Sequence, residues 1–335
     1  MTAELRMMTT GEGVPAKTRN LRRWGPRALQ GWTNLDGLFR KACGAFAVSI
    51  VGLLALVVYQ LVHASTLSIE RFGIGFVWEK VWDPVALKLG AATFIYGTLV
   101  TSTIALLIAV PLGIGIAIFL VEMAPRRVGS IIGFLIELLA AIPSIVYGLW
   151  GLFVLAPLVR VGLAPALRNT LGFLPLFSGE SNGVGMLTAG LILAIMVLPF
   201  IAAVSRDVLA AVPQAQREGS LALGTTKWET IWNVVLPYGR VGIAGAVILA
   251  LGRALGETMA VTMVIGNSPQ IMASLFQPGY TMSSVIANEY AEASGPLYLS
   301  ALTELGLLLF IVTFVVNGAA SLLIWRLTRG PGAHA

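Results

Sequence analysis

Residues 89–121 read LGAATFIYGTLVTSTIALLIAVPLGIGIAIFLV and contain no charged side chain. The hydrocarbon core of a bilayer is about 30 Å thick, and a helix of about 20 apolar residues crosses it. The stretch is longer than that, so we expect it to contain a transmembrane helix that ends near Leu120. Lipid, and not water, is the solvent to which this part of the chain is suited.

Five further stretches of the same kind accompany it. They cover residues 42–64, 128–159, 181–205, 241–266 and 298–325. Two of them are uncharged, and the other three hold Glu137, the pair Arg253 and Glu257, and Glu304. The sequence therefore predicts an all-α integral membrane protein, with six transmembrane helices in one domain over residues 42–326.

The composition agrees with this class. Hydrophobic residues make up 57% of the 335 residues and charged residues 11%, against about 25% charged in ordinary soluble proteins. A soluble fold of this size needs a charged surface that this chain cannot supply. Cys43 is the single cysteine, and His63 and His334 lie far apart, so we expect no disulfide, no metal site and no cofactor bound by this chain.

Lysine and arginine are unevenly shared between the two sides of the predicted bundle. Sixteen of the 22 fall in residues 1–41, in the loops after the second and fourth spans, and in the C-terminal tail. The positive-inside rule places these segments, and so both termini, in the cytoplasm. We expect a basic cytoplasmic extension over residues 1–41, suited to anionic lipid, and a cytoplasmic tail over 327–335. The net charge of +6 is then a topology signal and indicates no nucleic-acid partner.

Two segments on the opposite side are expected to be structured. Trp78 and Trp82 lie four apart in residues 76–83, which places them on one face of a helix at the membrane interface. Residues 268–294 are polar and contain prolines, which suits a re-entrant or gating element. Glu304 is expected near the outer interface, in contact with water.

The third predicted span is interrupted by Pro143 and Ser144. A helix break there would free backbone groups to line a pathway, and a simple packing kink is the equal alternative. Glu137 lies six residues before Pro143 in the same span. We expect it to pair with an arginine of this chain or of another subunit.

The loop between the fourth and fifth predicted spans, residues 206–240, has a regular pattern. Its central part, residues 212–237, reads VPQAQREGSLALGTTKWETIWNVVLP. Pro213 suits a helix start, because its missing N–H is harmless there. Residues 214–223 then read as a helix, which Gly224 would end with a left-handed backbone.

A second short helix is predicted over residues 227–235, ended by Pro237. Its apolar side chains would share one face, and they are Trp228, Ile231, Trp232 and Val235. Two short helices with exposed apolar residues on the cytoplasmic side favour a docking surface for another protein. The alternative is an amphipathic turn that rests on lipid headgroups.

This segment resembles the "EAA" signature of ABC importer permeases, which is Glu-Ala-Ala, three residues, Gly, nine residues, an aliphatic residue, any residue and Leu-Pro. The residues that match it in spacing are Glu218, Gly219, Ser220, Gly224, Val234, Leu236 and Pro237. Gly219 and Ser220 replace the two alanines, and both are small. The resemblance implies the type I permease fold, with this segment as the coupling helix in a groove of a separate ATPase.

The sequence contains no phosphate loop. The residues GTTK at 224–227 have neither the Gly-x-x-x-x-Gly-Lys-Ser/Thr spacing nor a strand before them. We therefore expect a subunit that is not an enzyme and that receives force from a partner ATPase. ATP and Mg would bind to that partner.

Arg253 and Glu257 lie four residues apart in the fifth predicted span, and so about 6 Å apart on one helix face. A charge at that depth costs at least about 2.5 kcal/mol on insertion scales, so both should face protein or water. Gly252 and Gly256 beside them would let another helix or a substrate approach. One interpretation is a structural ion pair, and the other is an anion site where arginine binds phosphate oxygens.

In the second interpretation the glutamate distinguishes between anions. An ionised carboxylate only accepts hydrogen bonds. Phosphate near neutral pH retains an O–H donor and sulfate does not, so Glu257 would accept a hydrogen bond from phosphate and repel sulfate. The pair therefore favours phosphate.

The sequence GRALGETMAV at 252–261 resembles the fifth-helix motif of phosphate importer permeases of the PstC type, whereas the PstA type usually has Ala-Pro after Gly-Glu-Thr. Further similar segments are GTLVTS at 97–102, AIFLVEMAP at 117–125 and AIPSIVYG at 141–148. The resemblance covers about residues 72–326. It implies a phosphate pathway at Arg253 and Glu257, with Thr258 next to them.

The resemblance also implies partners. They are a second permease of the PstA type, a dimeric ATP-binding subunit of the PstB type and an extracytoplasmic phosphate-binding protein of the PstS type. Together they would import phosphate across the inner cell membrane by alternating access. Two rival functions stay open: a permease for sulfate or molybdate, which shares the coupling loop, and a stand-alone ion-driven transporter, which leaves the 218–237 pattern without a role.

Overall fold

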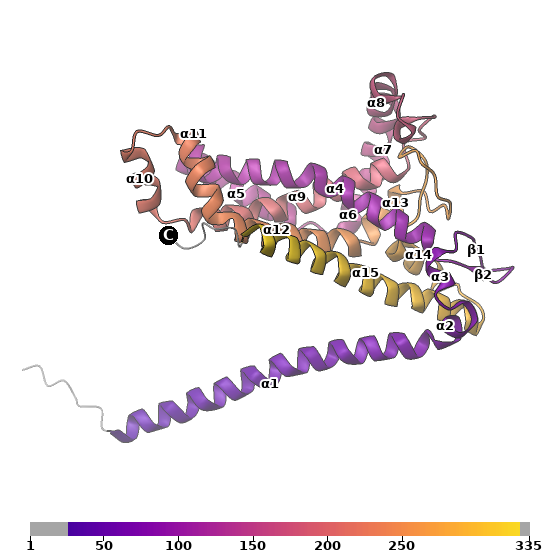
Figure 1. Ribbon diagram of the computed structural model, residues 1–335, viewed down its shortest axis with the longest axis horizontal. Helices are drawn as coiled ribbons and strands as arrows, with labels where there is room; N and C mark the ends of the chain where they lie inside the picture. Colours follow the sequence, from indigo (N-terminus) through magenta and orange to yellow (C-terminus); the bar gives the residue numbers. More distant parts are fainter. Residues whose placement is uncertain (1–25, 329–335) are drawn as a thin grey trace, which may run out of the picture. The chain divides into compact units, whose positions relative to one another are not determined.

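The computed structural model describes residues 26–328, and most of them are helical (Figure 1). They fall into two compact units, which meet between residues 57 and 58 of the long helix α1 (Pro26–Ala64), and each unit is described by itself. Residues 1–25 of the predicted basic extension and residues 329–335 of the predicted tail lie outside the described residues.

Within residues 26–328, six helices are long and apolar enough to cross a membrane, which confirms the predicted number. They are Gly37–Ala64, Ala92–Met123, Ser144–Leu171, Met186–Ala210, Lys227–Gly256 and Pro296–Arg326. Four of them coincide closely with predicted stretches. An uninterrupted apolar run of about 20 residues spans the bilayer as a helix, because only then are its backbone groups hydrogen-bonded within the membrane. The third and the fifth differ.

The predicted third span, residues 128–159, is wrong, because the chain breaks at Pro143. Before the break, α5 (Arg126–Ala140) has 15 residues, about 22 Å of helix, which is too short to cross a bilayer. Pro143 has extended backbone, with ψ 140°, and a new helix begins after it. The span itself consists of α6 (Ser144–Trp150), α7 (Ala156–Leu158) and α8 (Ala164–Leu171), joined by the π-helical turns η2 (Gly151–Leu155) and η3 (Val159–Leu163).

The fifth span begins and ends earlier than predicted. It consists of α11 (Lys227–Thr230), the π-helical turn η5 (Ile231–Val235) and α12 (Leu236–Gly256) in one continuous helix. The prediction that Pro237 ends a short helix is wrong, since Pro237 lies in the first turn of α12. The preceding π-helical turn shifts the hydrogen-bond pattern, so the proline stands as at a helix start, where a missing N–H is tolerated.

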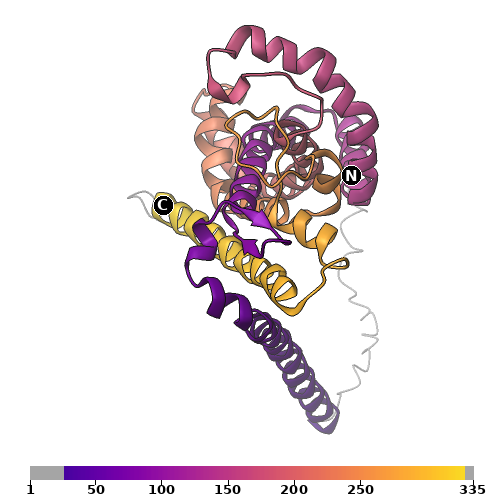
Figure 2. The ribbon, with the colours of Figure 1, turned by 90° about the vertical axis from the view of Figure 1, so that its right-hand side faces the viewer.

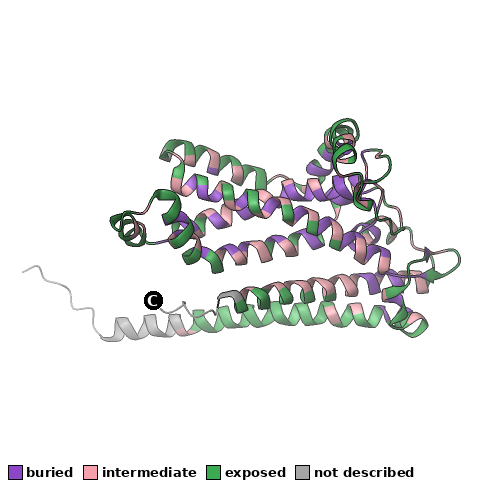
Figure 3. Cartoon of the chain, turned by 45° about the horizontal axis from the view of Figure 1, so that its top comes forward, coloured by how far each residue is buried: buried purple, intermediate pink, exposed green. Residues whose placement is uncertain are grey.

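The centre of the second unit is a close pair of helices, α4 (Ala92–Ile118) and α9 (Met186–Ala210), with α12 packed against both. A Cβ added at Gly190 would lie 2.6 Å from the Ile104 side chain, and one at Gly113 would lie 2.8 Å from that of Ile201. Small residues thus let these helix backbones approach, as expected of membrane helices. Their buried residues line the inside of the bundle (Figure 3).

The two ends of this unit are built differently. At the α10 end lie α10 (Gln214–Ala222), α11 and the π-helical turn η1 (Phe119–Met123) that follows α4 (Figure 1). The hairpin end, which faces the viewer in Figure 2, carries an antiparallel pair of strands, in which Trp82 is opposite Leu89. The two strands are β1 (Trp82–Asp83) and β2 (Lys88–Leu89). The same end contains α2 (Thr66–Phe72), α3 (Gly75–Trp78), the 3-10 turn η4 (Pro175–Phe177), α13 (Met259–Val264) and α14 (Met282–Glu289).

The prediction of one interfacial helix with both tryptophans is wrong. α3 ends at Trp78, which is 77% exposed, and Trp82 lies in β1 and is buried. The Trp82 indole N–H donates to Glu289 Oε2 at 2.8 Å, and the Tyr280 and Tyr298 hydroxyls donate to the same carboxylate. Burial raises the pKa of the Tyr280 hydroxyl, so this donor keeps its proton. Trp82 thus joins the hairpin to α14.

The prediction that Glu304 contacts water is also wrong. Glu304 lies in α15 (Pro296–Thr328) and is only 6% exposed. The short helix α2 packs against α15 beside it: the Ser68 N–H donates to Ser300 Oγ at 3.1 Å, and the Ser300 hydroxyl donates to the Ala64 carbonyl at 2.8 Å. An element outside the predicted spans therefore covers the carboxyl.

Candidate functional site

The fifth span ends inside the predicted pathway. α12 stops at Gly256, and Glu257 has extended backbone, with φ −67° and ψ 132°, before α13 begins at Met259. Arg253 lies in the last turn of α12, where the helix dipole favours a positive charge. The prediction that Arg253 and Glu257 share one helix face is therefore wrong, because the helix ends between them.

The two charges do not form the structural ion pair that one interpretation required. Among residues 26–328, Arg206 and Arg217 form ion pairs with carboxylates of this chain, and no ion pair joins Arg253 to Glu257. In the chain taken alone, Arg253 is exposed and Glu257 is half-buried. The described part of this chain thus supplies Arg253 with no carboxylate.

Glu257 is held by the two helices that begin beside it. Its Oε1 accepts a hydrogen bond from the Ala260 N–H at 3.3 Å, in the first turn of α13. Its backbone carbonyl accepts one from the Ser283 hydroxyl at 2.7 Å, in the first turn of α14. Next to it, the Thr258 hydroxyl donates to the Gly256 carbonyl at 3.2 Å. These contacts hold the Glu257 carboxylate at the start of α13.

The break at Pro143, directly before the third span, lies against this region. Tyr147 of α6 is buried, and its hydroxyl donates to the Leu139 carbonyl of α5 at 2.7 Å, which bridges the break. α6 also packs on α13, where a Cβ on Gly148 would lie 3.1 Å from the Ala260 Cα. The predicted break at Pro143 is confirmed, and its place in a pathway stays a prediction.

The predicted partner of Glu137 is identified. Glu137 in α5 accepts a hydrogen bond from Arg206 Nη2 in α9 at 2.9 Å, and Arg206 also contacts Asp207. The arginine belongs to this chain, which was one of the two alternatives. The pair is partly exposed, and it fastens α5 to α9.

The loop at the α10 end contains the first of the two predicted short helices, α10, whereas the second, predicted over residues 227–235, is the beginning of the continuous fifth span. α10 ends before Gly224, which has φ +86°, a left-handed value that favours glycine. α11 begins with a capping box, in which Thr226 Oγ1 accepts from the Glu229 N–H and the Glu229 carboxylate accepts from the Thr226 N–H. These two devices fix the turn between the helices.

The apolar residues of the second helix do not share one face, so that prediction is wrong. Ile231 and Val235 are buried at 2% and 0% exposure, whereas Trp228 and Trp232 are 55% and 61% exposed. The two indoles are stacked, with ring centroids 6.1 Å apart and planes at 25°. The helix therefore packs with one side on the bundle and presents an aromatic pair on the other.

The residues that carry the "EAA" signature are distributed along this loop. Glu218 and Gly219 are exposed in α10, and a Cβ on Gly219 would meet no atom within 4 Å, so an alanine would fit there. Ser220 is half-buried, as are Val234 and Leu236 in the helix that follows. The structure brings these residues into one compact element.

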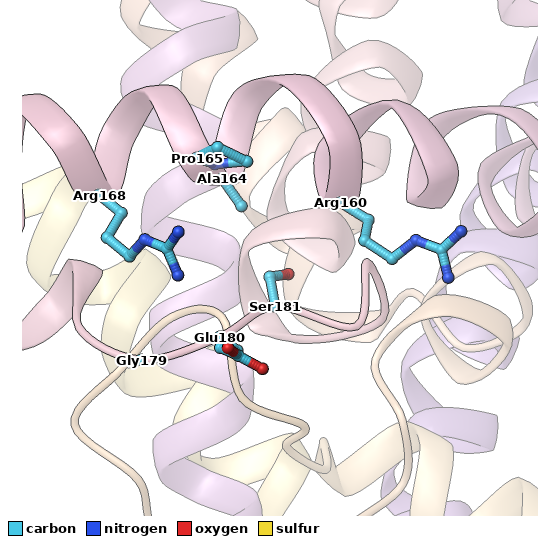
Figure 4. A pocket seen from close by; sticks show the side chains of 7 residues that line it. All are labelled: Arg160, Ala164, Pro165, Arg168, Gly179, Glu180 and Ser181. Atoms are coloured by element: carbon cyan, nitrogen blue, oxygen red, sulfur yellow. The ribbon is translucent and has the colours of Figure 1, made fainter.

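A pocket of about 160 Å³ lies at the hairpin end, between the last turns of the third span and the loop at 179–181. Arg160 and Arg168 line it from the helix, and Glu180 and Ser181 line it from the loop (Figure 4). The arginines are eight residues apart, about 12 Å along a helix. They form no ion pair with the described residues. Sequence analysis singled out neither as a site residue.

Residues 109–329 match the family described as "Binding-protein-dependent transport system inner membrane component". The chain belongs to this family. It is a multi-pass protein of the inner membrane, and its six apolar helices have the arrangement of an ABC importer permease.

Relatives of this permease agree over most of its length. It is 51% identical over 302 residues to a protein of Pasteurella multocida named "Phosphate transport system permease protein PstC", with 89% of this chain and 94% of that one covered. A protein of the same name from Mesorhizobium japonicum is 48% identical over 302 residues, with 89% and 92% covered. The "Probable phosphate transport system permease protein PstC" of Methanocaldococcus jannaschii is 41% identical over 289 residues, with 84% and 91% covered.

The fold of the permease is also found in a solved structure. That structure is a bacterial ABC transporter involved in the import of the acidic polysaccharide alginate, and one of its chains is similar with a TM-score of 0.59 and 16% identity. The similarity covers 90% of this permease and 100% of that chain. At this identity it shows a common fold.

One polar residue of the permease near the pathway was missed by the sequence analysis. Asn317 of α15 lies against α12, where a Cβ on Gly252 would come within 3.3 Å of Asn317 Nδ2. Its Oδ1 is buried without a hydrogen-bond partner among the described residues. Gly252 thus admits another helix, as predicted for a small residue, and an amide inside an apolar span was the signal that the sequence offered.

Proposed function

We propose that this chain is the permease subunit of an ATP-driven phosphate importer. The observation that carries the proposal is the broken fifth span, which presents Arg253, without a carboxylate partner from the described residues, next to Glu257. Relatives of up to 51% identity over most of the chain are named as phosphate permeases, which supports the same substrate.

Arg253, Glu257 and Thr258 bind phosphate in this proposal. The guanidinium donates hydrogen bonds to two phosphate oxygens, and such charge-assisted bonds are the strong ones. Glu257 accepts a hydrogen bond from the phosphate O–H, which sulfate does not have. The carboxylate already bonds the Ala260 N–H through Oε1, so its position is fixed before the substrate arrives.

The break before the third span and the break after the fifth span form the path for the substrate. Interrupted membrane helices leave backbone groups free to face a substrate near the middle of a membrane protein. Pro143 and Ser144 lie at one interruption, and the residues between α12 and α13 at the other. The Tyr147 hydroxyl holds the ends of the first interruption together.

The subunit itself does not hydrolyse ATP in this scheme and binds no cofactor. A dimeric ATPase of the PstB type, which uses ATP and Mg, docks on the loop at 218–237. The exposed Trp228–Trp232 pair is the apolar part of that docking surface, since large aromatic side chains dominate protein interfaces. A second permease of the PstA type completes the path.

The hairpin end receives an extracytoplasmic phosphate-binding protein of the PstS type. Arg160 and Arg168 are too widely spaced, at about 12 Å along a helix, for one small anion to bridge them. Two acidic side chains on a protein surface would fit that spacing. We therefore assign these two arginines to contact with the binding protein, which also agrees with both termini and the coupling loop being cytoplasmic.

Two other functions are weighed against this one. A sulfate or molybdate permease would share the coupling loop, but a carboxylate beside the arginine opposes an anion without a proton to donate. A stand-alone ion-driven transporter would need neither the capped α10–α11 turn nor the exposed tryptophan pair.

Reconstitution tests the proposal. The complex of this chain with its second permease and ATPase is placed in proteoliposomes with the binding protein, and ATP hydrolysis is measured with phosphate or with sulfate. We expect the ATPase to co-purify with this chain, and phosphate to stimulate hydrolysis where sulfate does not. Equal stimulation by the two anions would contradict the phosphate assignment, and failure of the ATPase to co-purify would contradict the importer.

A further inference from the structure

The helix α10 is attached to the rest of the protein in an unusual way. None of its nine residues is buried, and only Arg217 and Ser220 are half-buried. A surface helix normally packs through an apolar stripe. α10 instead contacts the bundle through these two polar side chains.

Arg217 joins α10 to the ends of two spans. Its Nε donates to Glu122 Oε1 at 3.0 Å, and its Nη2 lies 3.0 Å from the same oxygen, in the π-helical turn that ends the second span. Nη2 also donates to the Leu209 carbonyl at 2.8 Å, and Nη1 donates to the Val212 carbonyl, both at the end of the fourth span. The side chains of Arg217 and Glu122 are each 14% exposed. The guanidinium is therefore well supplied with acceptors from outside its own helix.

Ser220 joins α10 to the fifth span. Its Oγ lies 2.8 Å from Thr225 Oγ1 and 3.0 Å from Thr230 Oγ1, and these two threonine oxygens lie 3.0 Å apart. Thr225 Oγ1 also donates to the Ser220 carbonyl at 2.8 Å. Thr230 is buried and lies in α11, the first turn of the fifth span. The three hydroxyls thus connect the two short helices.

The span ends that α10 is fixed to form one packed body. Apolar residues from the second, fourth and fifth spans share a single buried cluster, and they are Ala117, Ile118, Leu209, Val212, Ile231, Val235 and Ile243. The segments on either side of α10 are turns, at Pro213 with ψ 137° and at Gly224 with φ +86°. Without the two polar attachments, α10 would be connected to this body only through those turns.

We propose that Arg217 and Ser220 are positioning residues that hold α10 rigidly on the three span ends, so that a movement imposed on α10 is transmitted to the spans. Hydrogen bonds are directional, so several of them fix the angle of the helix, which an apolar contact does less strictly. The serine, which departs from the "EAA" signature, supplies one of the two attachments. The transport part of this proposal rests on the proposed coupling to an ATPase.

The attachment is tested on the full chain in nanodiscs, without any partner, by amide hydrogen exchange of residues 214–222. We expect Arg217→Gln to increase exchange there by at least about tenfold, since the guanidinium's hydrogen bonds to Glu122 and to two backbone carbonyls are lost. Arg217→Lys keeps the charge but not the fork, and its increase is smaller. Ser220→Ala gives a lesser increase than Arg217→Gln. The matched control is Gly219→Ala, next to Ser220 at an open position, and it does not increase exchange, since alanine favours a helix more than glycine does.

Transmission is tested on the whole complex by phosphate taken up per ATP hydrolysed. Arg217→Gln should leave assembly and basal hydrolysis in place and lower this ratio several-fold. Arg206→Gln, which removes the ion pair between α5 and α9, should change the ratio less. Unchanged exchange in Arg217→Gln would overturn the attachment, whether or not phosphate is the substrate. Raised exchange with an unchanged ratio would overturn the role in transmission.

Discussion

Arg217 and Arg253 both lie next to the ends of membrane-spanning helices, and the fold treats them in opposite ways. Arg217 bonds to the Glu122 carboxylate and to two backbone carbonyls, and it is largely shielded from solvent. Arg253 is exposed in the chain taken alone and has no ion pair with the described residues.

The difference separates a structural from a functional charge. A buried charge is tolerated when acceptors surround it, and removing one partner is then strongly destabilising. A charge that is kept inside a span without such acceptors is a site for a ligand or another subunit. The two arginines therefore predict opposite phenotypes.

The largest effect is expected on stability, from Arg217→Gln. Arg217 and Glu122 are largely shielded, and hydrogen bonds to a charged group are worth about 1.5–3 kcal/mol, so removing the arginine should destabilise the protein by an amount of this order. A thermal unfolding scan of the purified chain should show a clearly lower transition. Arg253→Gln, measured in parallel, should unfold like the wild type, and equal destabilisation by the two changes would remove the distinction.

Transport should respond in the reverse order. Arg253→Gln is expected to lower phosphate uptake by about 100-fold, the loss of two charge-assisted hydrogen bonds to the anion. Uptake into proteoliposomes, with intact assembly shown by size-exclusion chromatography, gives the measurement. Uptake near the wild-type level would show that phosphate does not use this arginine.

Selectivity is the next effect in size. Glu257→Gln keeps a side-chain oxygen for the Ala260 N–H, so the start of α13 should be preserved. The amide no longer repels sulfate, and discrimination between phosphate and sulfate should fall by about tenfold, or about 1.4 kcal/mol. Competition of sulfate with labelled phosphate uptake measures it, and unchanged discrimination would assign Glu257 to the capping of α13 alone.

The smallest effect is expected at Pro143, where the chain breaks before the third span. Tyr147→Phe removes the hydrogen bond to the Leu139 carbonyl, worth about 1 kcal/mol, and leaves the ring in place. Uptake should fall a few-fold with little loss of stability. A variant that transports like the wild type would restrict this break to packing.

The sequence was sufficient for the features that depend on composition. The number of spans followed from apolar runs, and the short helix α10 followed from Pro213 and Gly224, because these signals act locally. The break at Pro143 could also be predicted. That residues 126–140 then form a separate helix, too short to cross a bilayer, was missed because the apolar run continues across the break.

Tertiary contacts decided the remainder. Pro143 breaks a helix and Pro237 does not, since a π-helical turn precedes the second. Glu304 is buried because α2 packs on α15, and Trp82 because Glu289 accepts its indole N–H. Arg253 and Glu257 were predicted as site residues from the sequence. Their four-residue spacing gave no sign that the helix ends between them. Each of these features depends on contacts or turns outside the local sequence pattern from which the prediction was made.

Electron cryo-microscopy of the assembled complex, loaded with phosphate and arrested before release, tests the central claim most directly. The account predicts density for a tetrahedral anion within hydrogen-bond distance of the Arg253 guanidinium, with the Glu257 carboxylate facing one of its oxygens. An Arg253 paired with a carboxylate of the second permease, and phosphate bound elsewhere, would contradict it.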